Sequence, residues 1–302
     1  MENYLIVILG PTGVGKTDLS IDIAKKYNTD IVSSDSRQVY KELNIGTAVP
    51  EPHYLEQVKH HFIQHLSVLD YYSASRFEES AMELLTELFK SKQAVVVSGG
   101  SMLYIDSLCN GIDELPTVDP ELRKELIERF ENEGLEPLRR ELKHLDPAYY
   151  DKVDLKNPKR ILHALEICYM TGKPFTELRT NIKKERPFKI IKLGLNRDRE
   201  ELYERINLRV DLMLEQGLEE EARSVYQHKA NNSLNTVGYK ELFDYFDGTI
   251  DKEEAIRLIK RNSRRYARKQ LSWFRRDDSV NWFHPEESEK IFDFLDKEIK
   301  NT

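Results

Sequence analysis

A glycine-rich segment close to the start of the chain constrains its fold more than any other feature. Residues 10–17 (GPTGVGKT) match the pattern G-x-x-x-x-G-K-[ST] at every fixed position. They follow the apolar run 4–9 (YLIVIL), which is typical of a strand buried on both faces, and they precede a helical pattern with Leu19, Ile23 and Tyr27. Glycines let backbone N–H groups surround phosphate oxygens, and the start of a helix adds its positive dipole. The sequence therefore predicts a phosphate-binding loop between a strand and a helix.

Two residues of this loop carry side-chain chemistry. Lys16 is expected to neutralise a terminal phosphate, and the hydroxyl of Thr17 suits Mg²⁺. The motif does not say which phosphorylated ligand is held. The apolar strand 94–97 (AVVV) runs into 98–100 (SGG), where a Walker-B Asp is expected, and the chain has no Asn-Lys-x-Asp segment for reading guanine. A GTPase or a motor-type ATPase is therefore disfavoured.

Strand and helix patterns alternate over the first 110 residues, which predicts an α/β fold with a parallel, doubly wound sheet. From Leu115 the pattern changes, because residues 119–180 contain helical segments broken by Gly and Pro and no convincing strand. We predict a P-loop core formed by residues 1–114 and 185–302, and an all-helical insertion domain at 115–184. The expected strands are 30–33, 94–97, 188–195 and a short one at Trp282 and Phe283; the expected helices include 74–90, 102–109, 199–214, 217–228, 252–276 and 287–299.

Composition excludes several classes of protein. The chain has 302 residues, of which 39% are hydrophobic, so it is long enough to bury at least one full core. No apolar run approaches the ~20 residues that span a bilayer, and the opening segment lacks the features of a signal peptide. The two cysteines, Cys109 and Cys168, form no motif, which disfavours a disulfide framework or a zinc site. We expect a cytoplasmic protein without membrane association.

A stripe of basic residues stands out in a chain of net charge −7. Its members recur at three- and four-residue spacing, which places them on one face of a helix, and no acidic residue occurs between Ala255 and Arg276. A charge run is usually a solvated face, but solvated faces normally mix signs. The stripe therefore favours a polyanionic partner. We call these six residues the basic stripe: Arg257, Lys260, Arg261, Arg264, Arg265 and Arg268.

An acidic residue is expected beside the phosphate loop. The second strand ends in 33–40 (SSDSRQVY), and ligands sit at the carboxyl ends of parallel strands, so Asp35 is predicted on the same edge as Lys16. A carboxylate there can act as a general base or as a metal partner. It can equally cap the helical turn that follows. The residues alone leave both roles open.

Two segments already described and several more stand in a distinctive order along the chain. They are GPTGVGKT, SSDSRQVY, NIGTAVP (44–50), GGSMLY (99–104), NPKRILHALEI (157–167), TGKP (171–174), LYERINLRVDLMLEQGL (202–218), TVGYKE (236–241) and RRYARKQLSWFR (264–275). Together they resemble one family, the tRNA dimethylallyltransferases, which prenylate the adenosine immediately 3′ of the anticodon. The resemblance runs from about Ile6 to Arg276. Three positions depart from the family's usual residue: Val49 for Lys, Ser101 for Thr and His163 for Arg.

The resemblance implies that the phosphate loop holds the pyrophosphate of dimethylallyl diphosphate rather than ATP, with Mg²⁺ as cofactor at Thr17. Pyrophosphate is the leaving group, and the adenine N6 amine captures the allyl group while Asp35 removes a proton. The implied catalytic residues are Lys16, Thr17, Asp35 and Ser101. The implied diphosphate-binding residues are Gly10, Pro11, Thr12, Gly13, Val14, Gly15, Lys16 and Thr17, together with Arg205 or Arg209.

The resemblance also implies that tRNA is the partner, bound through its anticodon stem-loop by a monomer. Gln38 is expected to read an adenine edge, and Tyr40 either stacks on a base or lies in the core. Ser101 either contacts RNA, orients Asp35 or caps a helix; Arg123 either contacts tRNA or is an ordinary surface residue. The implied tRNA-binding residues are Asp35, Ser36, Arg37, Gln38, Ser101, Arg123, Lys159, Arg160, Ile161, Leu162, His163, Lys240, Arg261, Arg264 and Arg268.

Two other functions remain open at this point. A nucleoside or nucleotide kinase also combines a P-loop core with a helical lid, but it consumes ATP. A non-catalytic RNA-binding protein would bind tRNA through the basic stripe without depending on Asp35.

Overall fold

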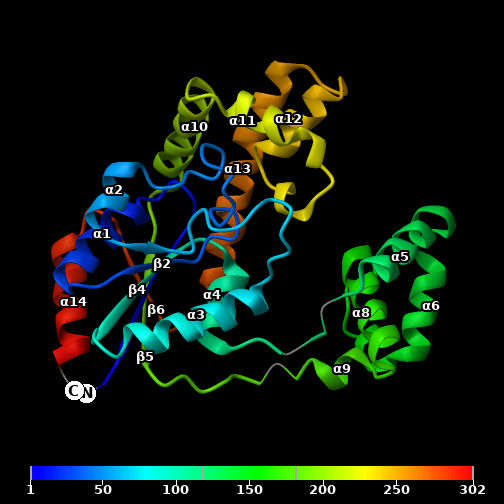
Figure 1. Cartoon of the computed structure of the whole chain (residues 1–302), viewed down its shortest axis with the longest axis horizontal. Helices are drawn as coiled ribbons and strands as arrows, with labels where there is room; N and C mark the ends of the chain where they lie inside the picture. Colours follow the sequence, from blue (N-terminus) through cyan, green and yellow to red (C-terminus); the bar gives the residue numbers. More distant parts are fainter. Residues whose placement is uncertain (1, 114, 117, 181, 301–302) are drawn as a thin grey trace. The chain divides into compact units, whose positions relative to one another are not determined.

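The chain folds into two compact units. The computed structural model describes residues 2–113, 115–116, 118–180 and 182–300. Unit 1 runs up to Asn110 and resumes at Glu185, whereas unit 2 is Gly111–Lys184 (Figure 1). The sequence analysis placed the insertion at 115–184, and its boundary residue Glu114 lies outside the described residues, as do residues 301–302.

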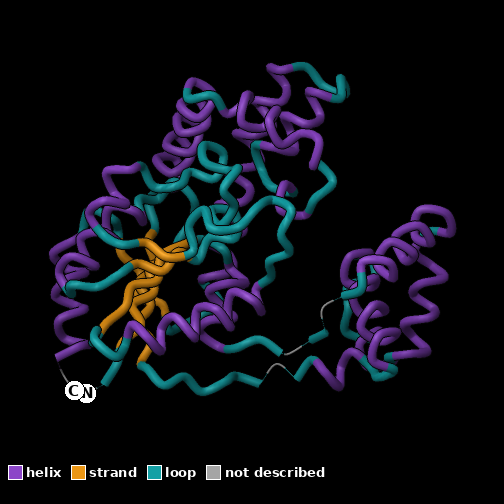
Figure 2. The backbone as a smooth tube through the Cα atoms, viewed as in Figure 1, coloured by secondary structure: helices purple, strands orange, loops and turns teal. Residues whose placement is uncertain are grey.

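Unit 1 is built on a six-stranded sheet in the order β3-β2-β4-β1-β5-β6 (Figure 2). Every neighbouring pair is parallel, so the predicted parallel α/β fold is confirmed, including the return of the chain to the sheet after the insertion. The two-residue strand β3 was not predicted, because it is too short to show a pattern. The strands are β1 (Tyr4–Leu9), β2 (Ile31–Ser33), β3 (His60–His61), β4 (Ala94–Gly99), β5 (Lys189–Leu195) and β6 (Val280–Phe283).

Helices cover both faces of this sheet (Figure 1). All six residues of β1 are buried, and they alternate between the two faces as a strand requires. Tyr4, Ile6 and Ile8 pack toward the first set of helices, while Leu5 and Val7 pack toward the second. The first set is α1 (Lys16–Lys26) and α14 (Ser288–Lys300), and the second is α3 (Ala74–Leu88) and α4 (Met102–Asn110).

A third hydrophobic cluster of unit 1 joins residues of the four α-helices between Arg199 and Phe274 with the segment 39–43. Tyr40 is 3% exposed within this cluster, so it is a core residue and not a base-stacking group. The expected helix 217–228 ends earlier, at Val225, and continues as a 3₁₀ turn (Tyr226–His228). The helices are α10 (Arg199–Glu215), α11 (Leu218–Val225), α12 (Tyr239–Phe246) and α13 (Lys252–Phe274), with a second 3₁₀ turn at Asn232–Leu234 and the short α2 (Pro52–Gln57) near the sheet.

The described residues of unit 2 form helices and their connecting segments, without a strand, and they have their own core, which contains Leu126, Leu138, Leu142 and Leu165. Three of the five helices among its described residues have both Pro in the first turn and a side-chain acceptor at the N-cap, where a missing N–H and an acceptor are favourable. The helices are α5 (Pro120–Glu133), α6 (Leu135–Leu145), α7 (Pro147–Tyr150), α8 (Pro158–Thr171) and α9 (Phe175–Leu178).

Cys109 lies in unit 1 and Cys168 in unit 2, and both are buried free thiols. No helix among the described residues is long and apolar enough to cross a membrane.

Candidate active site

The glycine-rich segment forms a loop between β1 and α1. Gly10 has a φ of 155°, and a Cβ built there would lie 2.7 Å from the carbonyl oxygen of Leu195, so no other residue fits. The ammonium of Lys16 donates hydrogen bonds to the carbonyl oxygens of Gly10 at 3.1 Å and Pro11 at 2.9 Å. The carbonyls at the start of the loop therefore face Lys16.

A cavity of about 500 Å³ opens beside this loop, and we call it the phosphate-side cavity. It brings together residues that are distant in sequence: the loop with the start of α1, the turn after β2, the segment 47–51, the end of β4, α10 and α13 contribute to its lining. Of the predicted diphosphate-binding residues, Gly10, Pro11 and Val14 are not among those that line it. Those that do are Thr12, Gly13, Gly15, Lys16, Thr17, Arg205 and Arg209.

Two arginines of α10 both reach the loop. The sequence left open which of them faces the phosphate site. Arg205 donates from Nε to the carbonyl of Gly13 at 3.0 Å, and Arg209 donates from Nη1 to the hydroxyl of Thr12 at 3.3 Å. They lie one helical turn apart, so one face of α10 presents both. Arg205 is exposed, whereas burial lowers the pKa of Arg209.

Lys16 sits in an environment that disfavours its charged form. Burial and the neighbouring Arg209 lower its pKa to about 8, and the carboxylate of Asp35 opposes this shift. A phosphate anion would favour the charged form. Binding of an anion above pH 8 must therefore be accompanied by uptake of a proton.

We expect the affinity of the protein for inorganic pyrophosphate to fall as the pH rises above about 8. The loss is about tenfold per pH unit until the pKa of Lys16 in the complex is reached. Calorimetric titrations from pH 7 to 10 measure it. Lys16→Arg is the control, because Arg stays charged and leaves only the titration of pyrophosphate itself. Parallel pH profiles for the two proteins would contradict the assignment.

Asp35 stands two residues after the end of β2 and lines the phosphate-side cavity together with Lys16. Its Oδ1 accepts hydrogen bonds from the backbone N–H of Arg37 at 2.8 Å and of Gln38 at 3.3 Å. The capping role that the sequence left open is thus realised by one carboxylate oxygen. It does not exclude the chemical role, because a carboxylate has two oxygens and Asp35 also interacts electrostatically with Lys16 of the loop and Arg209 of α10.

Ser101 lies between β4 and α4 and is 7% exposed. Its Oγ accepts a hydrogen bond from the N–H of Ser36 at 2.8 Å and donates to the Ser36 hydroxyl at 3.1 Å. The side chain is therefore used across the edge of the sheet and not as a cap on its own helix. It holds the residue that follows Asp35, rather than bonding to Asp35 itself.

A second cavity, of about 760 Å³, adjoins the first, and we call it the basic cavity. Five residues line both cavities: Thr12, Asp35, Thr47, Arg209 and Tyr266. Asp35 therefore faces the phosphate loop on one side and a cationic chamber on the other. Of the predicted tRNA-binding residues in unit 1, those that line the basic cavity are Asp35, Ser36, Arg37, Ser101, Lys240 and Arg268; two more basic residues, Arg265 and Lys269, join them.

Other predicted contacts are engaged elsewhere. Gln38 donates from Nε2 to the carbonyls of Thr47 at 3.2 Å and Ala48 at 2.8 Å. Its amide thus holds the 44–48 loop, which disagrees with the expectation that it reads adenine. Arg264 bonds to Asn207 on α10, and Arg261 bonds to Asn262 at 3.3 Å. Neither arginine lines the basic cavity.

The basic stripe is less uniform in space than in sequence. Asp211 on α10 pairs with Lys260, and Glu254 in the first turn of α13 pairs with Arg257. Both carboxylates lie outside the acid-free segment. The stripe therefore has a neutralised part near the start of α13 and an exposed part at Arg265 and Arg268.

Two residues of α13 were missed as site residues. Gln270 is 2% exposed; it donates to the carbonyl of Gly100 at 2.8 Å and accepts from the N–H of Thr12 at 2.9 Å, so it joins the phosphate loop to the end of β4. Tyr266 lines both cavities, and burial raises its pKa to about 12. Tyr266 and Gln270 lie four residues apart, so they share one face of α13. This spacing was visible in the sequence.

Unit 2 carries the other predicted contacts. Arg123 makes a two-pronged ion pair with Glu166, at 2.7 and 2.9 Å, and the same carboxylate accepts from His163 at 3.2 Å. Glu166 is 2% exposed, so Arg123 is not an ordinary surface residue. Ile161 and Leu162 are buried in the core of unit 2, which corrects their assignment as contacts. Lys159 and Arg160 are exposed.

A six-stranded parallel sheet covered by helices, with a glycine-rich loop between β1 and α1, defines an α/β protein. The sequence profile of the IPP transferase family matches residues 38–277, and the chain belongs to this family. A tRNA dimethylallyltransferase of Parabacteroides distasonis is 58% identical over 98% of this chain and 99% of its own length. The tRNA isopentenylpyrophosphate transferase of Bacillus halodurans is similar in structure, with a TM-score of 0.74, 34% identity and coverage of 100% of this chain and 98% of that chain. A eukaryotic dimethylallyltransferase solved acting on tRNA has a TM-score of 0.76 at 29% identity, over 90% of this chain and 69% of its own.

Proposed function

We propose that this protein transfers the dimethylallyl group of dimethylallyl diphosphate to the N6 amine of the adenosine immediately 3′ of the anticodon in tRNA, releasing pyrophosphate. The names of its relatives support prenyl transfer to tRNA. The observation that carries the proposal is the position of Asp35, in the wall that the phosphate-side cavity and the basic cavity share. A carboxylate there lies between a site for the leaving group and a site for the nucleophile.

The phosphate-side cavity suits the diphosphate of the donor. Lys16, Arg205 and Arg209 supply positive charge, and the loop supplies backbone N–H groups. Charge on the leaving group grows as the bond from C1 to oxygen breaks, and fixed cations stabilise that charge more than they stabilise the ground state. The proposal therefore assigns the loop to catalysis as well as to binding.

Thr17 would hold Mg²⁺ in this proposal, because Thr17, which carries a hydroxyl, and Asp35, which carries a carboxylate, both line the phosphate-side cavity. Among the described residues there is no group of three or more His, Cys, Asp or Glu side chains that could hold a metal ion. One hydroxyl and one carboxylate fit Mg²⁺, because this ion takes many of its ligands from phosphate and water. The ion would neutralise charge on the diphosphate.

The basic cavity suits the RNA. The nucleophile must leave the base stack to react, and Arg37, Lys240 and Arg268 surround the chamber into which it would enter. The N6 lone pair is delocalised into the adenine ring, so the amine is a weak nucleophile. As the bond from N6 to C1 forms, Asp35 would take one N6 proton, which leaves a neutral secondary amine.

Incubation with unmodified tRNA and dimethylallyl diphosphate, followed by nucleoside mass analysis, tests the proposal. We expect one adenosine per substrate tRNA to gain a dimethylallyl group, with pyrophosphate released in equal amount. A kinase would instead consume ATP, and an RNA-binding protein would retain tRNA without modifying it. Either of those results, without prenyl transfer, would overturn the proposal.

The exposed part of the basic stripe gives a prediction about tRNA affinity. A plot of log affinity against log salt concentration falls with salt. Replacing Arg265 and Arg268 by Gln is expected to make this fall less steep by about two slope units, or about one per lost phosphate contact. The matched control replaces Arg257 and Lys260 by Gln, since it removes the same charge from positions already paired with carboxylates. Filter binding across a salt series measures both slopes. Equal slopes in the two variants would count against RNA binding in the basic cavity.

A further inference from the structure

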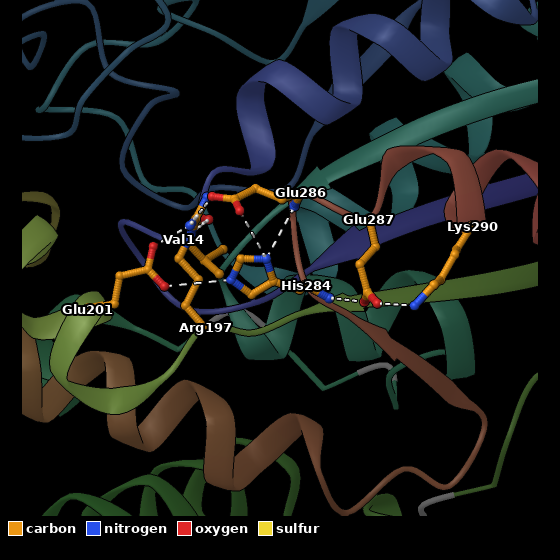
Figure 3. Close-up of polar contacts among 7 residues, drawn as sticks. All are labelled: Val14, Arg197, Glu201, His284, Glu286, Glu287 and Lys290. Carbon is orange, nitrogen blue, oxygen red and sulfur yellow. Dashed lines mark hydrogen bonds and ion pairs between the residues drawn. The ribbon is translucent and has the colours of Figure 1, made fainter.

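A buried arginine lies behind the phosphate loop, on the side away from the cavity. Arg197, between β5 and α10, is absent from the lining of both cavities, and its side chain is only 8% exposed. Its Nε donates a hydrogen bond to the carbonyl oxygen of Val14 at 2.9 Å (Figure 3). Neither the loop motif nor the predicted site residues include it.

Two carboxylates fix the guanidinium of Arg197. Glu201, in the first turn of α10, pairs with Nη1, and Glu286 lies 3.3 Å from the same nitrogen (Figure 3). Nε2 of His284 lies 3.5 Å from Glu201, and the N–H of Glu286 bonds to Nδ1 of the same ring at 3.4 Å. His284 and Glu286, which follow β6, therefore help to hold Arg197 in place, and Arg197 in turn holds the glycine-rich loop.

The bond to Val14 sets the direction of one amide. The carbonyl of Val14 and the N–H of Gly15 belong to the same planar trans peptide, so they point in opposite directions. Because Arg197 holds the carbonyl behind the loop, the N–H of Gly15 is turned the other way, and Gly15 lines the phosphate-side cavity. Gly15 has a φ of 106° and no Cβ, so its backbone would otherwise have wide freedom.

The paired carboxylates neutralise the charge of Arg197, so it contributes little to the field in the cavity. Its effect is therefore one of geometry. We propose that Arg197 is a positioning residue that presets the N–H of Gly15 to bind the diphosphate of the donor. This inference rests on the proposed function of the phosphate-side cavity.

Calorimetric titration of the full-length protein with inorganic pyrophosphate and Mg²⁺ tests the proposal. Arg197→Gln is expected to weaken pyrophosphate binding about tenfold, the effect of losing one hydrogen bond to an anion, while tRNA affinity changes less than twofold. The control is Arg199→Gln, which removes the same charge from an exposed residue whose guanidinium lies 5.2 Å from the ring of Tyr203. It is expected to bind pyrophosphate as the unmodified protein does.

Arg197→Lys covers the case in which the Gln variant does not fold. Lys keeps the ion pairs, but one ammonium does not reproduce the planar fork that reaches Val14 and the carboxylates together. We expect it to weaken pyrophosphate binding and to leave tRNA affinity intact. A folded Arg197→Lys protein with normal pyrophosphate affinity overturns the inference, as does an equal loss of both affinities, which would indicate general disorder. Absence of pyrophosphate binding in the unmodified protein would instead count against the proposed function.

Discussion

Replacing Lys16 by Ala is expected to lower the rate of prenyl transfer by at least ~10²–10³-fold, the effect of removing one group that stabilises developing charge. Lys16 lies in the phosphate-side cavity, where burial and Arg209 already disfavour its charged form. A cation held in such an environment is stabilised most when negative charge appears beside it. The largest effect should therefore fall on the chemical step, in which the bond from C1 to the pyrophosphate oxygen breaks.

Single-turnover transfer from radiolabelled dimethylallyl diphosphate to tRNA measures this effect. Lys25→Ala is the matched control, because Lys25 is an exposed residue of the same helix, where its ammonium bonds to Gln57 at 2.6 Å. It should transfer the prenyl group at the normal rate. Normal transfer by Lys16→Ala would rule out the assignment of the loop to the leaving group.

The parts of the fold that the sequence predicted are those with local signals. The strand at 4–9 and the loop at 10–17 are continuous in sequence, and their pattern is set by neighbouring residues. The two-residue strand β3 and the six-residue helix α2 carry too few residues to show a period. Their positions depend on what they pack against in the folded chain.

The parts of the site that the sequence missed depend on long-range contacts. Glu221 on α11 illustrates this, because its carboxylate accepts hydrogen bonds from the N–H groups of Asn44, Ile45 and Gly46 at 2.8–2.9 Å, across about 175 residues of chain. It thereby holds the loop that contains Thr47, which lines both cavities. Neither the composition around Glu221 nor its spacing distinguishes it from the adjacent Glu219 and Glu220.

Helix geometry and one long-range ion pair explain why the contacts predicted in unit 2 differ from the structure. Motif similarity placed residues 159–163 together as one RNA-contacting segment, but a helix turns its residues to different sides. Ile161 therefore faces the core of unit 2, while Lys159 and Arg160 are exposed. The link between Arg123 and Glu166 spans 43 residues and became evident only in the folded chain.

Replacing Asp35 by Asn is expected to lower kcat by of order 10²–10⁴-fold while the melting temperature stays nearly unchanged. The turn that follows β2 should survive, since Oδ1 of Asn still accepts the bonds from the N–H groups of Arg37 and Gln38. What the variant loses is the ability to accept a proton from N6. Asp22→Asn is the control, because Asp22 is an exposed residue of α1 that lines neither cavity, and it should leave both kcat and the melting temperature unchanged.

The affinity for pyrophosphate separates the three roles open to Asp35. Asp35 is an anion that faces Lys16 and Arg209, so its removal leaves those cations freer to bind the donor. A general base therefore predicts a large fall in kcat with pyrophosphate affinity unchanged or raised. A carboxylate that works through Mg²⁺ predicts weaker pyrophosphate binding, and a residue that only caps the turn predicts little change in either quantity. Kinetics, calorimetry and thermal melting of the one variant decide among them, and a near-normal kcat would refute the role of Asp35 as the base.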